Sequence, residues 1–380
     1  MKIIGCDFHP AVQQIAVFDS ETGEYSEHRL SNGDGEAERF YRALSMPCWI
    51  GIEACGNSRW FIDLLERLGH EVKVGDAAKI RASYVRKQKT DKRDAGHILT
   101  LLLENRFPAI WTPSRQQRDQ RQLLIHRHKL VQMRARIKNN LQHLALNQGM
   151  QRKSKLWTQT GQKMLKQLPL EGWTAIRRQD SLALLQQLDK QIEQLDEAAE
   201  LAASSDPQAC LLLRQKGVGP ITALAFSLTI GDVSRFEHSN QVASYLGLIP
   251  AEYTSSNKRR LGGISKQGNG FLRMLLVEAA QSVVRLDPQF HKHYVHLCRN
   301  KHKAVAKVAA ARKLAVRLYW VLRTEQEVQK AVHNESRSGV PLVSESQTAT
   351  LIERSRIQQR AASAGNDGKR KTRVSHIPNA

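Results

Sequence analysis

The stretch KIIGCDFHPAVQQIAVFD, residues 2–19, decides the fold. It contains two predicted strands, 2–8 and 13–19, and a third predicted strand follows at 25–31. Short runs of β-branched and other apolar residues, separated by Pro, Gly and acidic turn residues, are typical of β-strands. The chain therefore begins with three hairpin-type strands.

Helical and strand patterns alternate after this start. We predict helices at 33–45, 57–69, 78–87 and 91–106, and strands at 48–55 and 71–77. A sheet that begins with hairpins and continues through helix–strand units is mixed, with helices covering it. Residues 1–108 are thus predicted to form an α/β domain.

Four acidic residues stand out within this domain. QKTDKRDAGHI (88–98) places Asp91 and Asp94 three residues apart, on one face of a predicted helix where they repel each other. Asp7 lies in the apolar first strand and Glu53 ends the fourth. Buried carboxylates are costly unless a metal or base accompanies them. If the first and fourth strands are neighbours, all four acids converge.

Such a group of oxygen ligands suits Mg²⁺ or Mn²⁺, and two such ions could assist an in-line phosphoryl displacement. Taken singly, each acid has a plainer interpretation. Asp7 could cap a turn, and Asp91 and Asp94 could stabilise a helix N-terminus through its dipole. Both interpretations stay open at this point.

The net charge of +22 is unevenly distributed. Residues 1–110 hold 15 Lys and Arg against 16 acids, whereas the remainder holds 43 against 20. This asymmetry predicts that the later part binds a polyanion, with DNA or RNA favoured over a membrane surface. No apolar run approaches the roughly 18 residues of a membrane span. Five scattered cysteines without a CxxC pair predict reduced thiols and a cytoplasmic location, and binding to DNA would make the protein nucleoid-associated.

Residues 109–204 are predicted to be a basic helical linker with coiled-coil character. Leu123, Leu130, Ile137 and Leu144 recur every seven residues. Residues 115–163 carry 12 Lys and Arg but one acid, which favours contact with nucleic acid over a merely solvated face.

Residues 205–325 are predicted to form a helical domain, followed by a polar, disordered tail at 326–380. At its start, Gly217 and Gly219 precede a proline. This resembles the hairpin of helix-hairpin-helix modules, in which backbone amides bind DNA phosphates. An ordinary turn between helices is the alternative.

The order of GCDFH, GIEAC and TDKRDA resembles the ribonuclease H-like (RuvC-like) DEDD arrangement of Holliday-junction resolvases. More closely, it resembles the DEDD transposases of the IS110 family of bacterial insertion sequences. Residues 239–276, which contain PAEYTSSNKRRLGGISK, resemble the C-terminal transposase domain of that family. The resemblance extends over nearly the whole chain to about residue 325.

The resemblance implies a DNA recombinase in which Asp7, Glu53, Asp91 and Asp94 hold Mg²⁺ or Mn²⁺. Ser255 would form a covalent phosphoserine, with Ser256 as the alternative because one residue of alignment slip exchanges them. The resemblance also implies a dimer or tetramer and an element-encoded guide RNA. Basic residues around the serine are expected to contact phosphates: Lys258, Arg259, Arg260, Lys266 and Arg273.

Two other functions are compatible with the sequence, and a third is disfavoured by it. A resolvase-like nuclease would use the same metal site with water as nucleophile. A non-catalytic nucleic-acid-binding protein would need only the basic charge. An actin-like ATPase shares the early strand order but requires a second Gly-rich phosphate loop, and the sequence shows none.

Overall fold

The computed structural model describes residues 1–44, 47–84, 91–151, 155–254 and 260–338, with the backbone alone for 331–338. The chain forms two compact units, residues 1–113 and 114–380. The boundary falls just before a long helix. The finer division into a linker and a C-terminal domain stays a prediction.

The first unit is built on a five-stranded sheet in the order β3-β2-β1-β4-β5. The first three strands pair antiparallel, whereas β4 and β5 run parallel to β1. The mixed α/β prediction and the expected adjacency of the first and fourth strands are therefore confirmed. The strands are β1 (Lys2–Phe8), β2 (Val12–Asp19), β3 (Tyr25–Ser31), β4 (Trp49–Glu53) and β5 (Glu71–Gly75).

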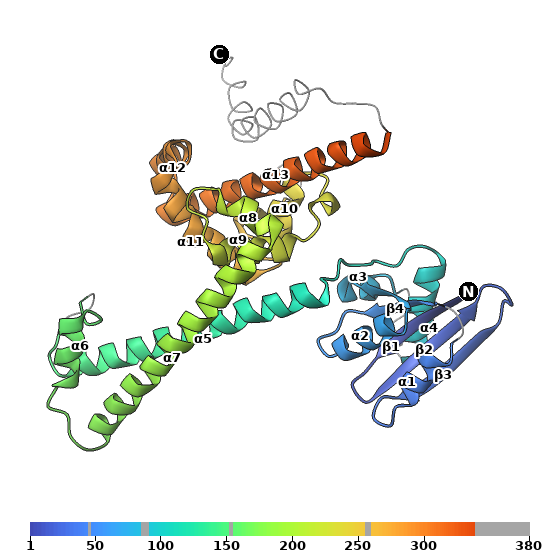
Figure 1. The fold of residues 1–380 in the computed structure, drawn as a ribbon, viewed down its shortest axis with the longest axis horizontal. Helices are drawn as coiled ribbons and strands as arrows, with labels where there is room; N and C mark the ends of the chain where they lie inside the picture. Colours follow the sequence, from blue (N-terminus) through green and yellow to red (C-terminus); the bar gives the residue numbers. More distant parts are fainter. Residues whose placement is uncertain (45–46, 85–90, 152–154, 255–259, 339–380) are drawn as a thin grey trace, which may run out of the picture. The chain divides into compact units, whose positions relative to one another are not determined.

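Helices cover both faces of this sheet (Figure 1). Alternate residues of β1 and β4, such as Ile4 and Ile50, pack in a core with α1 (Glu36–Arg42) and α2 (Arg59–Arg67). On the other face Ile3 packs against α4 (Asp91–Leu103). The short α3 (Ala77–Ala82) follows β5.

Two glycines allow α4 to lie directly on the strands. A Cβ on Gly5 of β1 would come within 2.3 Å of the Ala95 carbonyl oxygen and 2.5 Å of the Leu99 nitrogen. On β4, a Cβ on Gly51 would meet the Leu102 side chain at 2.7 Å. At Gly5 the neighbours are backbone atoms, and only a residue without a side chain lets two backbones approach so closely. The position of α4 is thus set by the sequence of β1 and β4.

The second unit begins with two long antiparallel helices, α5 (Arg115–Asn147) and α7 (Gly172–Ser205) (Figure 1). Ser114 caps α5 through a reciprocal pair of hydrogen bonds with Gln117. Leu130 packs between Leu188 and Ile192, and α6 (Gln159–Lys166) closes the far end of the pair. The predicted helix pair is present; its assignment as a coiled coil stays a prediction.

The remaining helices pack around α9 (Pro220–Ile230), which is buried from Thr222 to its end. The surrounding elements are α8 (Pro207–Leu213), a 3₁₀ turn (Val233–Arg235), α10 (Ser239–Tyr245), α11 (Gly270–Leu286), α12 (Pro288–Asn300) and α13 (Lys303–Ser338). A short hairpin of β6 (Pro250–Glu252) and β7 (Leu261–Ile264) interrupts them. The sequence did not predict this hairpin, since the expected domain was helical throughout.

The predicted start of the tail is also wrong. Helix α13 continues to Ser338, so residues 326–338 are helical, and residues 339–380 lie outside the described residues. The extension contains neither Gly nor Pro before Gly339, and six of the thirteen residues 326–338 are Glu, Gln, Lys or Ala, which favour helix. Across the described part of the chain, every helix is too short or too polar to cross a membrane.

Candidate active site

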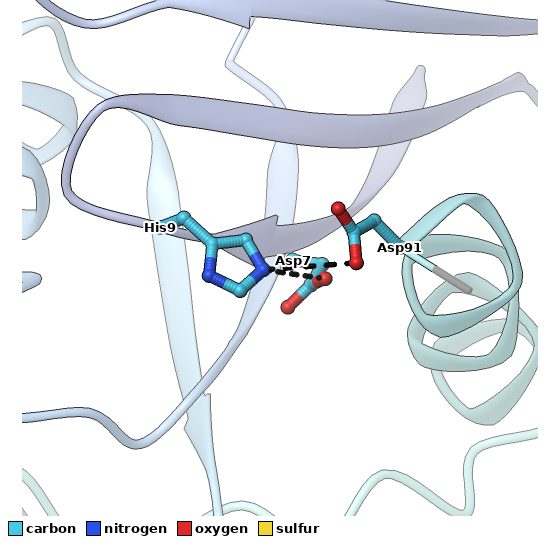
Figure 2. A group of neighbouring side chains, drawn as sticks. All are labelled: Asp7, His9 and Asp91. Carbon is cyan, nitrogen blue, oxygen red and sulfur yellow. Dashed lines mark hydrogen bonds and ion pairs between the residues drawn. The ribbon is translucent and has the colours of Figure 1, made fainter. Parts of the chain in front are cut away.

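Asp7, His9 and Asp91 come together at the end of β1 (Figure 2). The His9 Nε2 atom lies 3.2 Å from Asp7 Oδ2 and 3.9 Å from Asp91 Oδ1. One potential ligand atom from each of the three residues lies within 4.8 Å of the others. The Asp7 side chain is 13% exposed, whereas those of His9 and Asp91 are 49% and 67% exposed. The group therefore has a buried base and an open side.

Asp94 lies one turn further along α4 and is 3% exposed. The Tyr84 hydroxyl donates a hydrogen bond of 2.6 Å to its Oδ1 atom. The Tyr84 ring in turn packs against His97, with ring centroids 4.2 Å apart, and the His97 Nε2 atom is 2.8 Å from the Ser83 hydroxyl. These contacts fix the buried carboxylate from the side of α3.

Glu53 is the last residue of β4. The parallel register pairs Cys6 with Ile52, so Asp7 and Glu53 follow at the same level on neighbouring strands. Because alternate residues of a strand share a face, both project from the face that α4 covers. Among the described residues, the close three-residue group comprises Asp7, His9 and Asp91, and Glu53 and Asp94 lie outside it.

Electrostatic effects nevertheless connect the four acids. Burial raises the pKa of Asp7; His9 opposes this shift, while the charges of Asp94 and Asp91 add to it. Burial also raises the pKa of Tyr84, with further contributions from its hydrogen bond to Asp94 and from the charges of Asp94, Asp7 and Glu53. All four carboxylates thus act on the same small region.

The donor set fits a divalent cation. Two carboxylates and one imidazole converge on a partly open position, and such groups are common ligands of divalent ions. The raised pKa of Asp7 reflects burial and like-charge repulsion that a cation would relieve. Asp7 and Asp91 would offer the oxygen donors of this group to an ion, and Glu53 and Asp94 act electrostatically on the same region.

The predicted serine loop connects β6 to β7. Ser255, Ser256, Lys258 and Arg259 lie outside the described residues. The described ends of the loop are joined by a hydrogen bond of 2.8 Å from the Tyr253 nitrogen to the Arg260 carbonyl oxygen. The described residues on either side of the candidate nucleophiles are therefore paired in a β-hairpin.

The other predicted phosphate contacts occupy distinct positions. Arg260 and Lys266 are exposed. The Arg273 guanidinium donates to the carbonyl oxygens of Leu246 and Gln267, at 2.9 and 2.6 Å, so it joins two loops. This contact gives Arg273 a structural role; its phosphate contact stays a prediction.

Gly217 and Gly219 form the turn before α9. Gly217 has a φ of 80°, and a Cβ there would lie 2.7 Å from the Val283 nitrogen. Gly219 precedes Pro220, the first residue of α9, as predicted. Close packing on α11 thus gives one physical reason for Gly217, and phosphate binding by the turn stays a prediction.

The basic helix α5 obtains counter-charges from α7. Arg127 pairs with Asp196 at 2.6 Å, and Arg134 pairs with Asp189 at 3.2 Å. The compensating acids that its own sequence lacks therefore come from the neighbouring helix. Lys129 and Arg136 are exposed and remain the better candidates for contact with nucleic acid.

Sequence reasoning missed two residues of the site. It searched for carboxylates and passed over His9, although a residue two positions after Asp7 near a strand end projects to the same side. It also missed Tyr84, which no sequence pattern linked to Asp94.

The fold and donor set are compatible with a DEDD transposase. A transposase profile of the IS110 DEDD type matches residues 4–149, and the profile described as Transposase IS116/IS110/IS902 family matches residues 209–295. The chain belongs to this family of insertion-sequence transposases, which are enzymes acting on DNA.

Individual relatives resemble most of the chain. A Pseudomonas aeruginosa protein named "Probable family 20 transposase" is 28% identical over 292 residues, which cover 74% of this chain and 84% of the relative. The transposase for insertion sequence element IS1111A of Coxiella burnetii is 25% identical over 75% of this chain and 78% of its own length. The transposase for IS1328 of Yersinia enterocolitica is 28% identical over 76% and 87%.

Proposed function

We propose that this protein cleaves and rejoins DNA strands through a covalent phosphoserine, using a ribonuclease H-like metal site. The observation that carries the proposal is the group of Asp7, His9 and Asp91, brought together from β1 and α4 with Asp94 and Glu53 nearby. Bound Mg²⁺ or Mn²⁺ would supply Lewis-acid stabilisation of the charge that develops on the phosphoryl oxygens.

In this proposal the residues of the chain have separate roles. Asp7, Glu53, Asp91 and Asp94 hold the cation. Ser255 Oγ forms a bond to phosphorus while a P–O bond of the DNA backbone breaks, and the serine proton passes to the leaving oxygen. Attack by a new DNA hydroxyl then reverses the exchange, releases Ser255 and rejoins the strand, so no bond energy is lost to hydrolysis.

Partner contacts follow from the basic charge and the family. Lys258, Arg259, Arg260 and Lys266 would contact phosphates around the serine. Lys129 and Arg136 present positive charge along α5. We propose that a structured RNA encoded by the element guides a dimer or tetramer to its target by base pairing, as in other guided systems.

The test is detection of a denaturant-resistant protein–DNA adduct. The full chain is incubated with Mg²⁺, the ends of its element and co-expressed element RNA. The native protein and Ser256→Ala should form the adduct, whereas Ser255→Ala and Asp7→Asn should not. An adduct that persists in Ser255→Ala but disappears in Ser256→Ala would move the nucleophile by one residue.

A nuclease that uses water as nucleophile is the second candidate. One observation favours it: the acidic residues of the candidate site all lie within residues 1–113. Hydrolysis by water at these residues would need no serine from the second unit. This alternative predicts that Ser255→Ala still cuts DNA and that no variant forms an adduct.

A further inference from the structure

We propose that His9 is a direct nitrogen ligand of the metal site and shifts its preference toward first-row transition ions such as Mn²⁺ over Mg²⁺. The proposal rests on the proposed function only in that these carboxylates hold a metal. It adds a residue outside the four predicted acids and names what that residue selects.

The position of the imidazole is the first reason. His9 Nε2 lies between two carboxylates, 3.2 Å from Asp7 Oδ2 and 3.9 Å from Asp91 Oδ1 (Figure 2). These are the spacings expected of ligand atoms that share one ion, and all three atoms lie within 4.8 Å. The distance to Asp7 alone is also compatible with a hydrogen bond, so the experiment has to separate the two roles.

The second reason is the network that fixes the turn carrying His9. Asn32 Nδ2 donates to the carbonyl oxygens of His9 and Pro10, at 2.8 and 3.2 Å. Its Oδ1 accepts from the fully buried Gln13 at 2.7 Å, and Gln13 Oε1 accepts from the buried Tyr41 hydroxyl at 3.1 Å. A polar network whose inner end is buried and whose groups are satisfied restrains the backbone to which it bonds. The backbone at His9 is therefore fixed, although the His9 side chain is 49% exposed.

The chemistry of the ligand gives the selectivity. Mg²⁺ requires oxygen ligands in near-ideal octahedral geometry and gives up water reluctantly. Imidazole nitrogen is a softer donor that binds first-row transition ions more readily. Replacing one oxygen position by His9 thus stabilises Mn²⁺ more than Mg²⁺.

The test measures metal binding by the full chain and does not depend on DNA cleavage. Calorimetry gives the affinities for Mn²⁺ and Mg²⁺, and pulsed electron paramagnetic resonance of bound Mn²⁺ detects a directly coordinated nitrogen. The variants are His9→Ala and His9→Gln, of which the second keeps a hydrogen-bond donor. His28→Ala is the matched control. His28 is an exposed residue of β3 whose ring contacts Phe40 of α1, and α1 covers the face of the sheet opposite to α4.

The native protein and His28→Ala should show the nitrogen coupling. Both His9 variants should lose it, with Mn²⁺ affinity falling by at least about tenfold and Mg²⁺ affinity changing less. If His9→Gln keeps native Mn²⁺ affinity, or the coupling persists without His9, the residue is a hydrogen-bond partner and the inference is wrong. Asp7→Asn separates this outcome from failure of the proposed function. If Asp7→Asn loses all metal binding while His9→Ala binds metal as the native protein does, the carboxylate metal site stands and only the inference about His9 fails.

Discussion

Substituting Gly5 by alanine should damage the site without touching any of its side chains. An added Cβ would lie 2.3 Å from the Ala95 carbonyl oxygen, and both that oxygen and the Leu99 nitrogen belong to the backbone of α4. An ordinary contact is about 3.4 Å, so the helix must retreat by about 1 Å. No rotamer change can relieve this clash, because a Cβ is fixed by its own backbone and the atoms that it meets belong to the backbone of α4.

The cost follows from overpacking in a closely packed core. Extra methyl groups typically destabilise by about 1–3 kcal/mol, and the upper part of this range applies because a whole helix moves. The same movement carries Asp91 and Asp94 away from Asp7. Gly5→Ala should therefore lower both the stability of the first unit and its affinity for Mn²⁺.

Urea unfolding followed by hydrogen exchange measures the effect locally. Peptides from residues 2–19 and 91–103 report the first unit, and peptides from α11 serve as an internal standard. Gly51→Ala is the matched control, since its Cβ would meet the side chains of Leu102 and Ile98, which can shift. If Gly5→Ala stays within about 0.5 kcal/mol of the native protein, α4 is not held by direct contact with β1.

Three further outcomes are expected. Tyr84→Phe removes the 2.6 Å hydrogen bond to Asp94 and should lower the free energy of unfolding in urea by about 1 kcal/mol. The decrease should be smaller when Mg²⁺ is present, and an equal decrease with and without Mg²⁺ would contradict this. Gly217→Ala combines a φ of 80° with a 2.7 Å clash and should destabilise the second unit by about 1–3 kcal/mol, whereas Gly263→Ala, which meets nothing within 4 Å, should be neutral by the same measurement. Burial raises the pKa of Asp287, but the hydrogen bond from Arg317 and those from backbone amides outweigh it and hold the pKa below its usual value. Asp287→Asn should therefore cost about 1 kcal/mol at neutral pH. The difference from the native protein should begin to shrink below about pH 4 and disappear as the pH falls through the lowered pKa of Asp287; a constant difference down to about pH 2 would refute the charge pairing.

The sequence predicted the first unit closely because its strands carry a local signal. The strands Lys2–Phe8 and Tyr25–Ser31 have the predicted bounds, and the order of helices and strands is as expected. The apolar residues of Lys2–Phe8 are buried on both faces of the sheet, so the composition of this strand reveals it, whereas in Tyr25–Ser31 only Leu30 is buried. The convergence of the acids required β1 and β4 to be neighbours; the sheet order meets this condition and places Asp7 level with Glu53.

The missed elements lack such a signal. Hairpin β6–β7 has three and four residues in its strands, mostly exposed, so no apolar alternation marks it. Helix α13 continues beyond residue 326, where the sequence becomes polar and the tail was predicted to begin. It continues because the polar extension contains no residue that breaks a helix. Hydrophobic patterning detects elements that contribute to a core and overlooks those that do not.

The two aspartates that open α4 illustrate why a site can be read in part from local rules. A helix N-terminus stabilises negative charge, which offsets some of the repulsion between Asp91 and Asp94. Direct contact of α4 with Gly5 then brings that charged turn to the end of β1, where burial has already made the Asp7 carboxylate costly to ionise. Each feature is tolerable alone, yet together they bring several negative charges close to one another, with the half-exposed His9 beside Asp7 and Asp91. If a cation binds here, as we propose, it should stabilise this arrangement, and the hydrogen bond from Tyr84 to Asp94 is the contact that such binding should make partly redundant.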